Sequence, residues 1–214
     1  MQENLPFILN FVVMCIKAVA LLVFISLSVM FLIWWERKVS AHIQSRLGPM
    51  IVGWHGWLQS IADTVKLLLK ENIVPHAADK VSFWLAPIVV FTASFLPFVV
   101  IPFSKNLIVC DLNLGLFYVL AVSSLGVIGI FMAGWGSGNK YSLLGGMRIA
   151  AQIISYEIPL ILSVLTVVML AGTLSTVKIV ESQAKLWFIF LQPVAFVVYF
   201  ISAVAEVNRA PFDI

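Results

Sequence analysis

An acidic residue, Glu157, lies in the middle of a long apolar segment that begins close to Arg148. At about 1.5 Å per helical residue, Glu157 would lie roughly 13 Å into a hydrocarbon core about 30 Å thick. An ionisable group at that depth is costly and indicates a function, with a structural hydrogen-bonded carboxyl as the alternative. Because Glu157 points away from Arg148, Gln152 and Ser155 on a helix, its partner must come from another helix or from water.

The last apolar segment of the chain carries a stripe of polar residues on one helical face. At helical spacing one face collects Gln192, Tyr199, Ser202, Glu206 and Arg209. Such a face should contact other protein or enclosed water. Together with Glu36, which ends the first apolar segment, Glu157 and Glu206 supply the acids from which a hydrated proton path can be built. The alternative is that Glu206 and Arg209 form an ion pair at the membrane boundary.

The composition identifies an integral membrane protein. Hydrophobic residues make up 62% of the 214 residues and charged residues 11%, with a mean hydropathy of +1.06, which excludes a soluble globular domain. The net charge of +3 does not indicate a nucleic-acid partner, because the basic residues stand at the ends of apolar runs. Cys15 and Cys110, with no CxxC pattern, predict no metal site.

The apolar segments predict an all-α fold with five transmembrane helices. They run over residues 7–35, 81–103, between 111 and 140, 147–172 and 186–206. Asp111 is expected to cap the third helix and Pro97 to kink the second. The residues before Phe7 are acidic and the run after them is longer than a signal sequence, so the first segment is expected to be a retained span.

A polar interval, residues 36–80, separates the first two spans. Within it, residues 57–70 form an amphipathic pattern, with Trp57 on the apolar face and Asp63 and Lys66 on the polar face. This helix is too short and too polar to cross the bilayer, so we expect it to lie in the membrane interface. The alternative is a solvated connector in which Asp63 pairs with Lys66.

The basic residues predict which side this polar interval faces. One side collects Arg37, Lys38, Arg46, Lys66, Lys70, Lys80, Lys140, Arg148 and Arg209. The other side collects Lys17, Lys105, Lys178 and Lys185. The richer side is expected to be the cytoplasm, or the matrix or stroma of an organelle.

Several separate motifs occur in one order along the chain. They are Glu36-Arg37-Lys38, the run 44–49 (QSRLGP), the run 58–63 (LQSIAD), the run 141–148 (YSLLGGMR), the run 154–159 (ISYEIP) and the run 205–213 (AEVNRAPFD). From about Trp34 to the last residue the sequence closely resembles the quinone-chamber membrane subunit of respiratory complex I, which is subunit 1 of NADH:quinone oxidoreductase and is called the H subunit in bacteria.

This resemblance implies a membrane subunit of a proton-translocating NADH:quinone oxidoreductase that forms part of the quinone-binding chamber and couples quinone reduction to proton translocation. It implies a quinone-chamber set comprising Arg37, Arg46 and Asp63. It also implies a proton-coupling set comprising Glu36, Glu157, Glu206, Arg209 and Asp213. No catalytic residue or metal site is expected in this chain alone.

The same resemblance implies the ligands and partners. A quinone (ubiquinone, menaquinone or plastoquinone) would be the substrate, whereas NADH, FMN and iron-sulfur clusters would belong to partner subunits. The chain would assemble with other membrane-arm and peripheral-arm subunits in a bacterial plasma membrane, or in a mitochondrial inner or thylakoid membrane. Residues 36–80 would face the cytoplasm, matrix or stroma.

Two other functions are compatible with the sequence. The homologous subunit of a membrane-bound hydrogenase or of a ferredoxin-linked quinone reductase would share these motifs, and the chain does not identify the electron donor. An ion-coupled transporter could use Glu157 and the polar stripe directly. Inverted repeats and broken helices would favour transport, and neither is visible in the sequence.

The resemblance also predicts more protein than these 214 residues. The family pattern continues past Asp213 into an acidic loop and three further spans, giving an eight-helix subunit. Intramembrane acids need walls of protein or enclosed water, which five spans do not complete. We therefore expect residues 1–214 to be the N-terminal part of one transmembrane domain, or to be completed by helices of a neighbouring chain.

Overall fold

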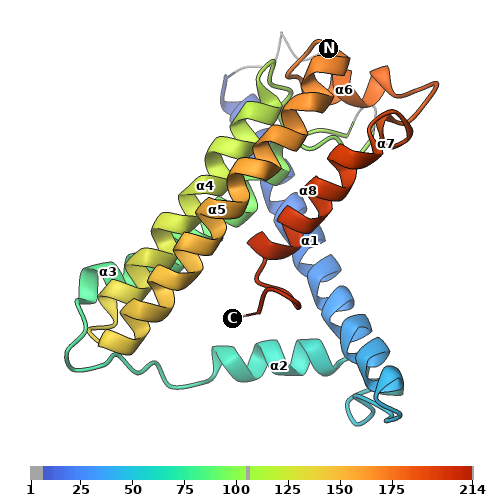
Figure 1. Cartoon of the computed structure of the whole chain (residues 1–214). Helices are drawn as coiled ribbons and strands as arrows, with labels where there is room; N and C mark the ends of the chain where they lie inside the picture. The colour runs from blue at the N-terminus through green and yellow to red at the C-terminus, as the bar shows by residue number, and fades with distance from the viewer. Residues whose placement is uncertain (1–6, 105–106, 214) are drawn as a thin grey trace. The chain divides into compact units, whose positions relative to one another are not determined.

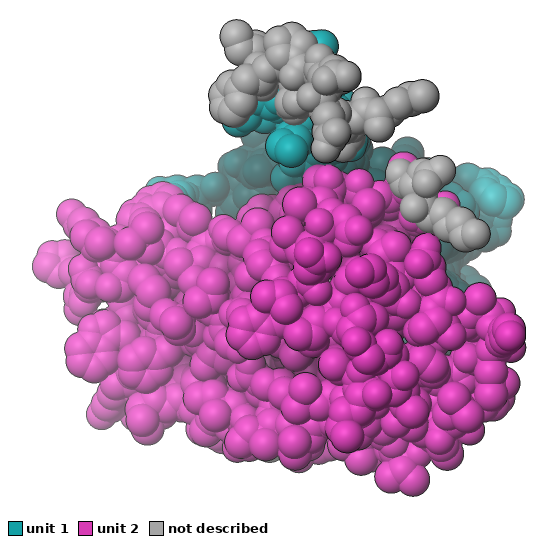
Figure 2. All heavy atoms as spheres, turned by 90° about the horizontal axis from the view of Figure 1, so that it is seen from above, with its two compact units in different colours: residues 1–73 teal, residues 74–214 magenta. Residues whose placement is uncertain are grey.

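The computed structural model describes residues 7–104 and 107–213, which are helical except for connecting turns and an isolated bridge between Ser104 and Leu107 (Figure 1). The chain divides into two compact units, residues 1–73 and 74–214 (Figure 2). Lys105 and the acidic N-terminal residues, on which two of the predictions depend, lie outside the described residues.

Unit 1 is built on one long helix, α1 (Phe7–Ile43). Its 37 residues span roughly 55 Å, well beyond a hydrocarbon core of about 30 Å. The first span was predicted to end at Trp35, but the helix continues to Ile43 because a change from apolar to charged side chains does not interrupt backbone hydrogen bonding. Arg37 is therefore carried on the same helix as the membrane segment.

A tight turn connects α1 to the 3₁₀ helix η1 (Trp54–Gly56) and then to α2 (Gln59–Leu68). The Lys38 ammonium donates to the carbonyl of Leu47 at 3.2 Å. Gly48 has a φ of +69°, and a Cβ at this position would lie 2.9 Å from the Cβ of Ala41. Glycine tolerates a positive φ and has no Cβ to clash with Ala41, so the turn can pack closely on the end of α1.

Unit 2 begins with α3 (Lys80–Phe95), the 3₁₀ helix η2 (Leu96–Val100) and α4 (Gly115–Gly136). Helices α3 and α4 pack along each other (Figure 1). A Cβ on Gly129 of α4 would lie 2.6 Å from Cγ2 of Val90 and 3.0 Å from its backbone nitrogen. The missing side chain thus allows close approach, as small residues do between membrane helices.

Helix α5 (Lys140–Ala171) packs against α4 on one side and α8 on another. It begins before the predicted Met147 because the side chain of Asn139 accepts a hydrogen bond from the Tyr141 backbone at 2.9 Å and caps the first turn. It ends at Gly172, whose φ of +66° is the usual left-handed cap.

The last predicted span is interrupted. After α6 (Thr176–Ser182), the chain forms α7 (Phe188–Leu191), breaks at Gln192 and continues as α8 (Pro193–Glu206). Pro193 has no backbone N–H and disfavours helical geometry in the residue before it, which accounts for the break. The side-chain oxygen of Gln192 accepts a hydrogen bond from the Thr166 hydroxyl of α5 at 2.8 Å, and its side-chain nitrogen donates to the Thr166 carbonyl at 3.2 Å.

The predicted all-α membrane fold is confirmed. Within the described residues, the helices long and apolar enough to span a bilayer are 11–43, 80–100, 115–136 and 140–171, and the shorter apolar helix α8 corresponds to the fifth predicted span. The regular helix α3 gives way to 3₁₀ geometry at Leu96–Val100, around Pro97.

Two local predictions were wrong. Asp111 does not cap α4, because the helix starts at Gly115 with Leu114 at the cap position and no side-chain cap bond. Arg209 is not on the helical stripe, because α8 ends at Glu206 and Asn208 adopts a φ of +50°. In both places a turn separates the charged residue from the helix.

Candidate functional site

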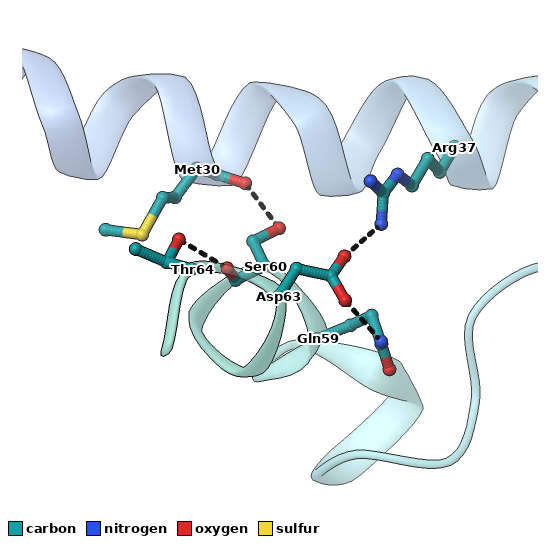
Figure 3. Close-up of polar contacts among 6 residues, drawn as sticks. All are labelled: Met30, Arg37, Gln59, Ser60, Asp63 and Thr64. Atoms are coloured by element: carbon teal, nitrogen blue, oxygen red, sulfur yellow. Dashed lines mark hydrogen bonds and ion pairs between the residues drawn. The ribbon is translucent and has the colours of Figure 1, made fainter. Parts of the chain in front are cut away.

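In unit 1, the ring of Trp57, just before α2, and a hydrogen bond from α2 itself contact α1. The ring of Trp57 lies 5.8 Å from that of Phe31 and 5.0 Å from that of Trp34, measured between centroids. The Ser60 hydroxyl, which is buried, donates to the carbonyl of Met30 at 3.0 Å (Figure 3). The first half of the amphipathic helix is therefore anchored to α1, and Leu68, at its other end, remains largely exposed.

These contacts bring together two predicted quinone-chamber residues. A guanidinium nitrogen of Arg37 lies 2.6 Å from a carboxylate oxygen of Asp63, and the Gln59 amide donates to the other oxygen at 3.0 Å (Figure 3). The hydrogen bond from Arg37 has the largest effect on the pKa of Asp63, and that from Gln59 the second largest. Both bonds lower this pKa from its ordinary value of 3.8. The direct partner of Asp63 is thus Arg37 and not Lys66, which adds only a weaker attraction.

A pocket of about 360 Å³ lies beside this ion pair in unit 1. Its lining consists of Ile33, Glu36, Arg37, Ser40, Arg46, Gly48 and Pro49. The Arg46 side chain donates to Gln44 at 2.7 Å. One pocket thus combines an acid, two guanidinium groups and the turn at Gly48, and it collects Glu36 from the proton-coupling set with two members of the quinone-chamber set.

In unit 2, Glu157 is part-buried on α5 and accepts a hydrogen bond from the Ser124 hydroxyl of α4, which also contacts the Leu120 carbonyl of its own helix. The prediction that its partner comes from another helix is confirmed. Glu206, in the last turn of α8, is also part-buried, and α8 packs against α5. Two acids of the predicted proton-coupling set therefore lie on helices that pack together.

The other two members of that set follow α8. Arg209 and Asp213 are exposed and lie in the segment 207–213, which we call the α8 loop. The sequence predicted Arg209 on the same helical face as Glu206. The structure instead places it beyond the helix end, where its position depends on what holds the loop.

An apolar pocket of about 450 Å³ also lies in unit 2, among α4–α8. The amides of Gln183 and Gln192 in its wall are hydrogen-bonded within the protein, so this pocket offers little polar chemistry. Among the described residues, no group of three or more His, Cys, Asp and Glu side chains could hold a metal ion.

Sequence reasoning missed some of the residues that support these sites. Gln59 lies four residues before Asp63 on α2, so helical spacing carried a signal for their contact. Ser124 carried none, because one serine in an apolar helix usually bonds its own backbone. Its contact with Glu157 depends on how α4 and α5 pack.

Comparison with known families gives a match over most of the chain. Residues 16–214 match a family described as NADH dehydrogenase. This region contains every residue of both predicted sets.

Curated relatives agree with this match. Proteins named as the H subunit of NADH-quinone oxidoreductase are similar to the chain: that of Carboxydothermus hydrogenoformans is 48% identical over 213 residues, which are 100% of this chain and 61% of the relative. That of Dehalococcoides mccartyi is 56% identical over 191 residues (89% and 54%), and that of Bacillus cereus 54% identical over 180 residues (84% and 54%). The chain thus spans little more than half the length of these relatives.

Proposed function

Because the chain belongs to the NADH dehydrogenase family, we propose that it is a membrane subunit of a proton-translocating NADH:quinone oxidoreductase. In this proposal it forms part of the quinone-binding chamber and couples quinone reduction to proton translocation. Relatives named as subunits of an NADH-quinone oxidoreductase support the reaction class. NADH, FMN and iron-sulfur clusters would belong to partner subunits, and the complex would lie in an energy-converting membrane.

The observation that carries the coupling role is the pair of part-buried acids in unit 2. Glu157, on a long apolar helix, has a hydroxyl partner from α4, and Glu206 lies on α8, which packs against α5. Burying two carboxyl groups in a membrane protein is costly, and such residues typically mark proton pathways.

The chemistry of unit 1 supports the quinone role. A quinone head group has carbonyl oxygens that accept hydrogen bonds and a ring that packs on aromatic side chains. Arg37 and Arg46 offer donors in one pocket, and Trp34 and Trp57 offer aromatic surface on the same unit. Reduction of a quinone to a quinol takes up protons with the electrons, so a chamber of this kind needs acids such as Glu36 nearby.

Turnover of the purified complex in proteoliposomes tests the proposal. We expect NADH to reduce a short-chain ubiquinone or menaquinone analogue with acidification of one compartment. An ion-coupled transporter would show no quinone-dependent turnover, and this result would contradict the proposal.

The quinone role has its own test. Asp63→Ala should raise the KM for the quinone analogue by about threefold or more, because Arg37 loses its partner and reorients. Lys66→Ala is the matched control on the same helix. Equal kinetics in the two variants would remove Asp63 from the quinone-chamber set.

A further inference from the structure

One amide side chain holds the segment that follows α8. The Nε2 atom of Gln152, on α5, lies 2.9 Å from the carbonyl oxygen of Ala205, 3.1 Å from Oδ1 of Asn208 and 3.1 Å from the carbonyl oxygen of Phe212. Its two hydrogens are thus shared among three acceptors. These acceptors lie at the end of α8, at the turn and near the end of the α8 loop.

A ring contact one helical turn away strengthens this attachment. Tyr156 is four residues after Gln152 and so lies on the same face of α5. Its ring meets that of Phe212 edge to face, with centroids 5.2 Å apart. The loop also closes on itself, since the Phe212 N–H donates to the Arg209 carbonyl at 2.8 Å. The loop is therefore fixed to α5 at both of its ends.

The turn held by Gln152 has an uncommon backbone. Asn208 has a φ of +50°, a left-handed conformation that asparagine tolerates better than most residues. In this conformation its side chain accepts the hydrogen bond from Gln152. Because Asn208 is adjacent to Arg209, its conformation determines where the backbone of Arg209 lies.

We infer that Gln152 is a positioning residue whose amide fixes the α8 loop to α5 and thereby sets the positions of Arg209 and Asp213. This inference rests on the proposed function of those two residues in proton coupling. Gln152 itself needs no contact with quinone or with the transferred proton. Its substitution should therefore affect turnover through the loop.

Two variants separate hydrogen-bond donation from packing. Gln152→Ala removes the amide, and Gln152→Glu keeps its shape but loses both N–H donors while ionised. Ser155→Ala is the matched control, because its hydroxyl donates to the Ala151 carbonyl within α5 and not to the loop. All variants are made in the full complex.

Deuterium exchange measures the attachment directly. In Gln152→Ala and Gln152→Glu, peptides covering residues 207–213 should exchange about tenfold faster than in wild type and in Ser155→Ala, because two or more hydrogen bonds are lost. Unchanged exchange in both variants would overturn the inference.

Turnover separates positioning from a purely structural role. The kcat for NADH-driven quinone reduction should fall by about threefold or more in both Gln152 variants, with the KM for quinone within about twofold of wild type. In Gln152→Glu, kcat should partly recover on acidification, when a protonated carboxyl can donate. Faster exchange with normal kcat would overturn the positioning role. Absence of quinone turnover in wild type would instead contradict the proposed function, and the exchange experiment would still test whether Gln152 holds the loop.

Discussion

Glu157 and Asp63 are carboxylic acids in opposite surroundings. Asp63 is exposed by 37% at its side chain, and Arg37 and Gln59 stabilise its charge. Glu157 is part-buried on an apolar helix and has one hydroxyl donor. A carboxylate held by a guanidinium stays ionised and can organise a binding surface, whereas an acid within a membrane helix typically marks a proton pathway. The two residues are thus suited to different parts of the proposed reaction.

Replacing Glu157 by glutamine tests the proton role, because an amide keeps the shape but cannot carry a proton. Glu157→Gln should lower proton translocation and kcat by about tenfold or more, with the KM for quinone little changed. Proton uptake and quinone reduction in proteoliposomes measure both quantities. Unaltered pumping in a fully assembled complex would contradict this role.

Two serines of α4 provide a graded comparison for that experiment. Ser124 contacts both Glu157 and the Leu120 carbonyl, so Ser124→Ala removes the donor to Glu157 and should lower kcat by a smaller factor, because the acid remains. Ser123 bonds the same Leu120 carbonyl, so Ser123→Ala controls for that backbone bond and should leave kcat unchanged. Equal effects of the two serine substitutions would indicate that the bond to Glu157 has no role.

The Arg37–Asp63 pair has a defined pH dependence. The folded-state pKa of Asp63 is depressed below 3.8, so the pair stabilises α2 on α1 above that value and is lost as the pH falls through the lower, folded-state pKa. Deuterium exchange of residues 59–68 should be slower in wild type than in Asp63→Asn. The ratio of the two exchange rates should be constant above about pH 5 and should approach one in acid. A ratio that changed between about pH 6 and 8 would contradict this assignment.

At the scale of helices, close packing of α3 and α4 depends on Gly129. A Cβ would meet the Val90 side chain and backbone nitrogen, so Gly129→Ala should destabilise the protein by about 1–3 kcal/mol through overpacking. Gly145→Ala is the control, because a Cβ there has no neighbour within 4 Å and alanine favours a helix by up to about 1 kcal/mol over glycine. Thermal unfolding of the purified complex should show a lower midpoint for Gly129→Ala alone.

The sequence predicted the helices better than it predicted their ends. Hydrophobic runs and helical spacing correctly gave the membrane segments and the helix that contains Asp63, since both signals are local. Asp111 was assigned as a cap because acidic residues often begin helices, but the chain turns once more before Gly115. The stripe through Gln192 and Arg209 assumed one straight helix, and Pro193 and the turn at Asn208 interrupt it.

The candidate sites were predictable only as residue types. Glu157 could be recognised as an unusual acid from its place in an apolar run, and its need for an outside partner followed from helix geometry. That the partner is Ser124, and that Gln152 holds the α8 loop, depends on contacts between segments far apart in sequence. Periodicity identifies the face of a helix, and packing decides which segment meets it.

For the whole molecule, the distribution of basic residues predicts the orientation in the membrane. Residues 36–80 carry six of the nine basic residues assigned to one side, and a lysine- and arginine-rich side normally remains in the cytoplasm. Lys70, in the polar interval, and Lys185, between α6 and α7, are both exposed and lie on the two predicted sides. Cysteines at these positions report on orientation once the native Cys15 and Cys110 are replaced by serine.

Labelling with a membrane-impermeant maleimide tests this orientation. Cell-derived vesicles with the cytoplasmic face outward should label Lys70→Cys, and vesicles of the opposite orientation should label Lys185→Cys, because the reagent cannot cross the hydrocarbon core. Detergent-permeabilised vesicles should label both variants equally, which controls for local reactivity. The reverse pattern would place residues 36–80 on the opposite side of the membrane and would contradict the predicted orientation.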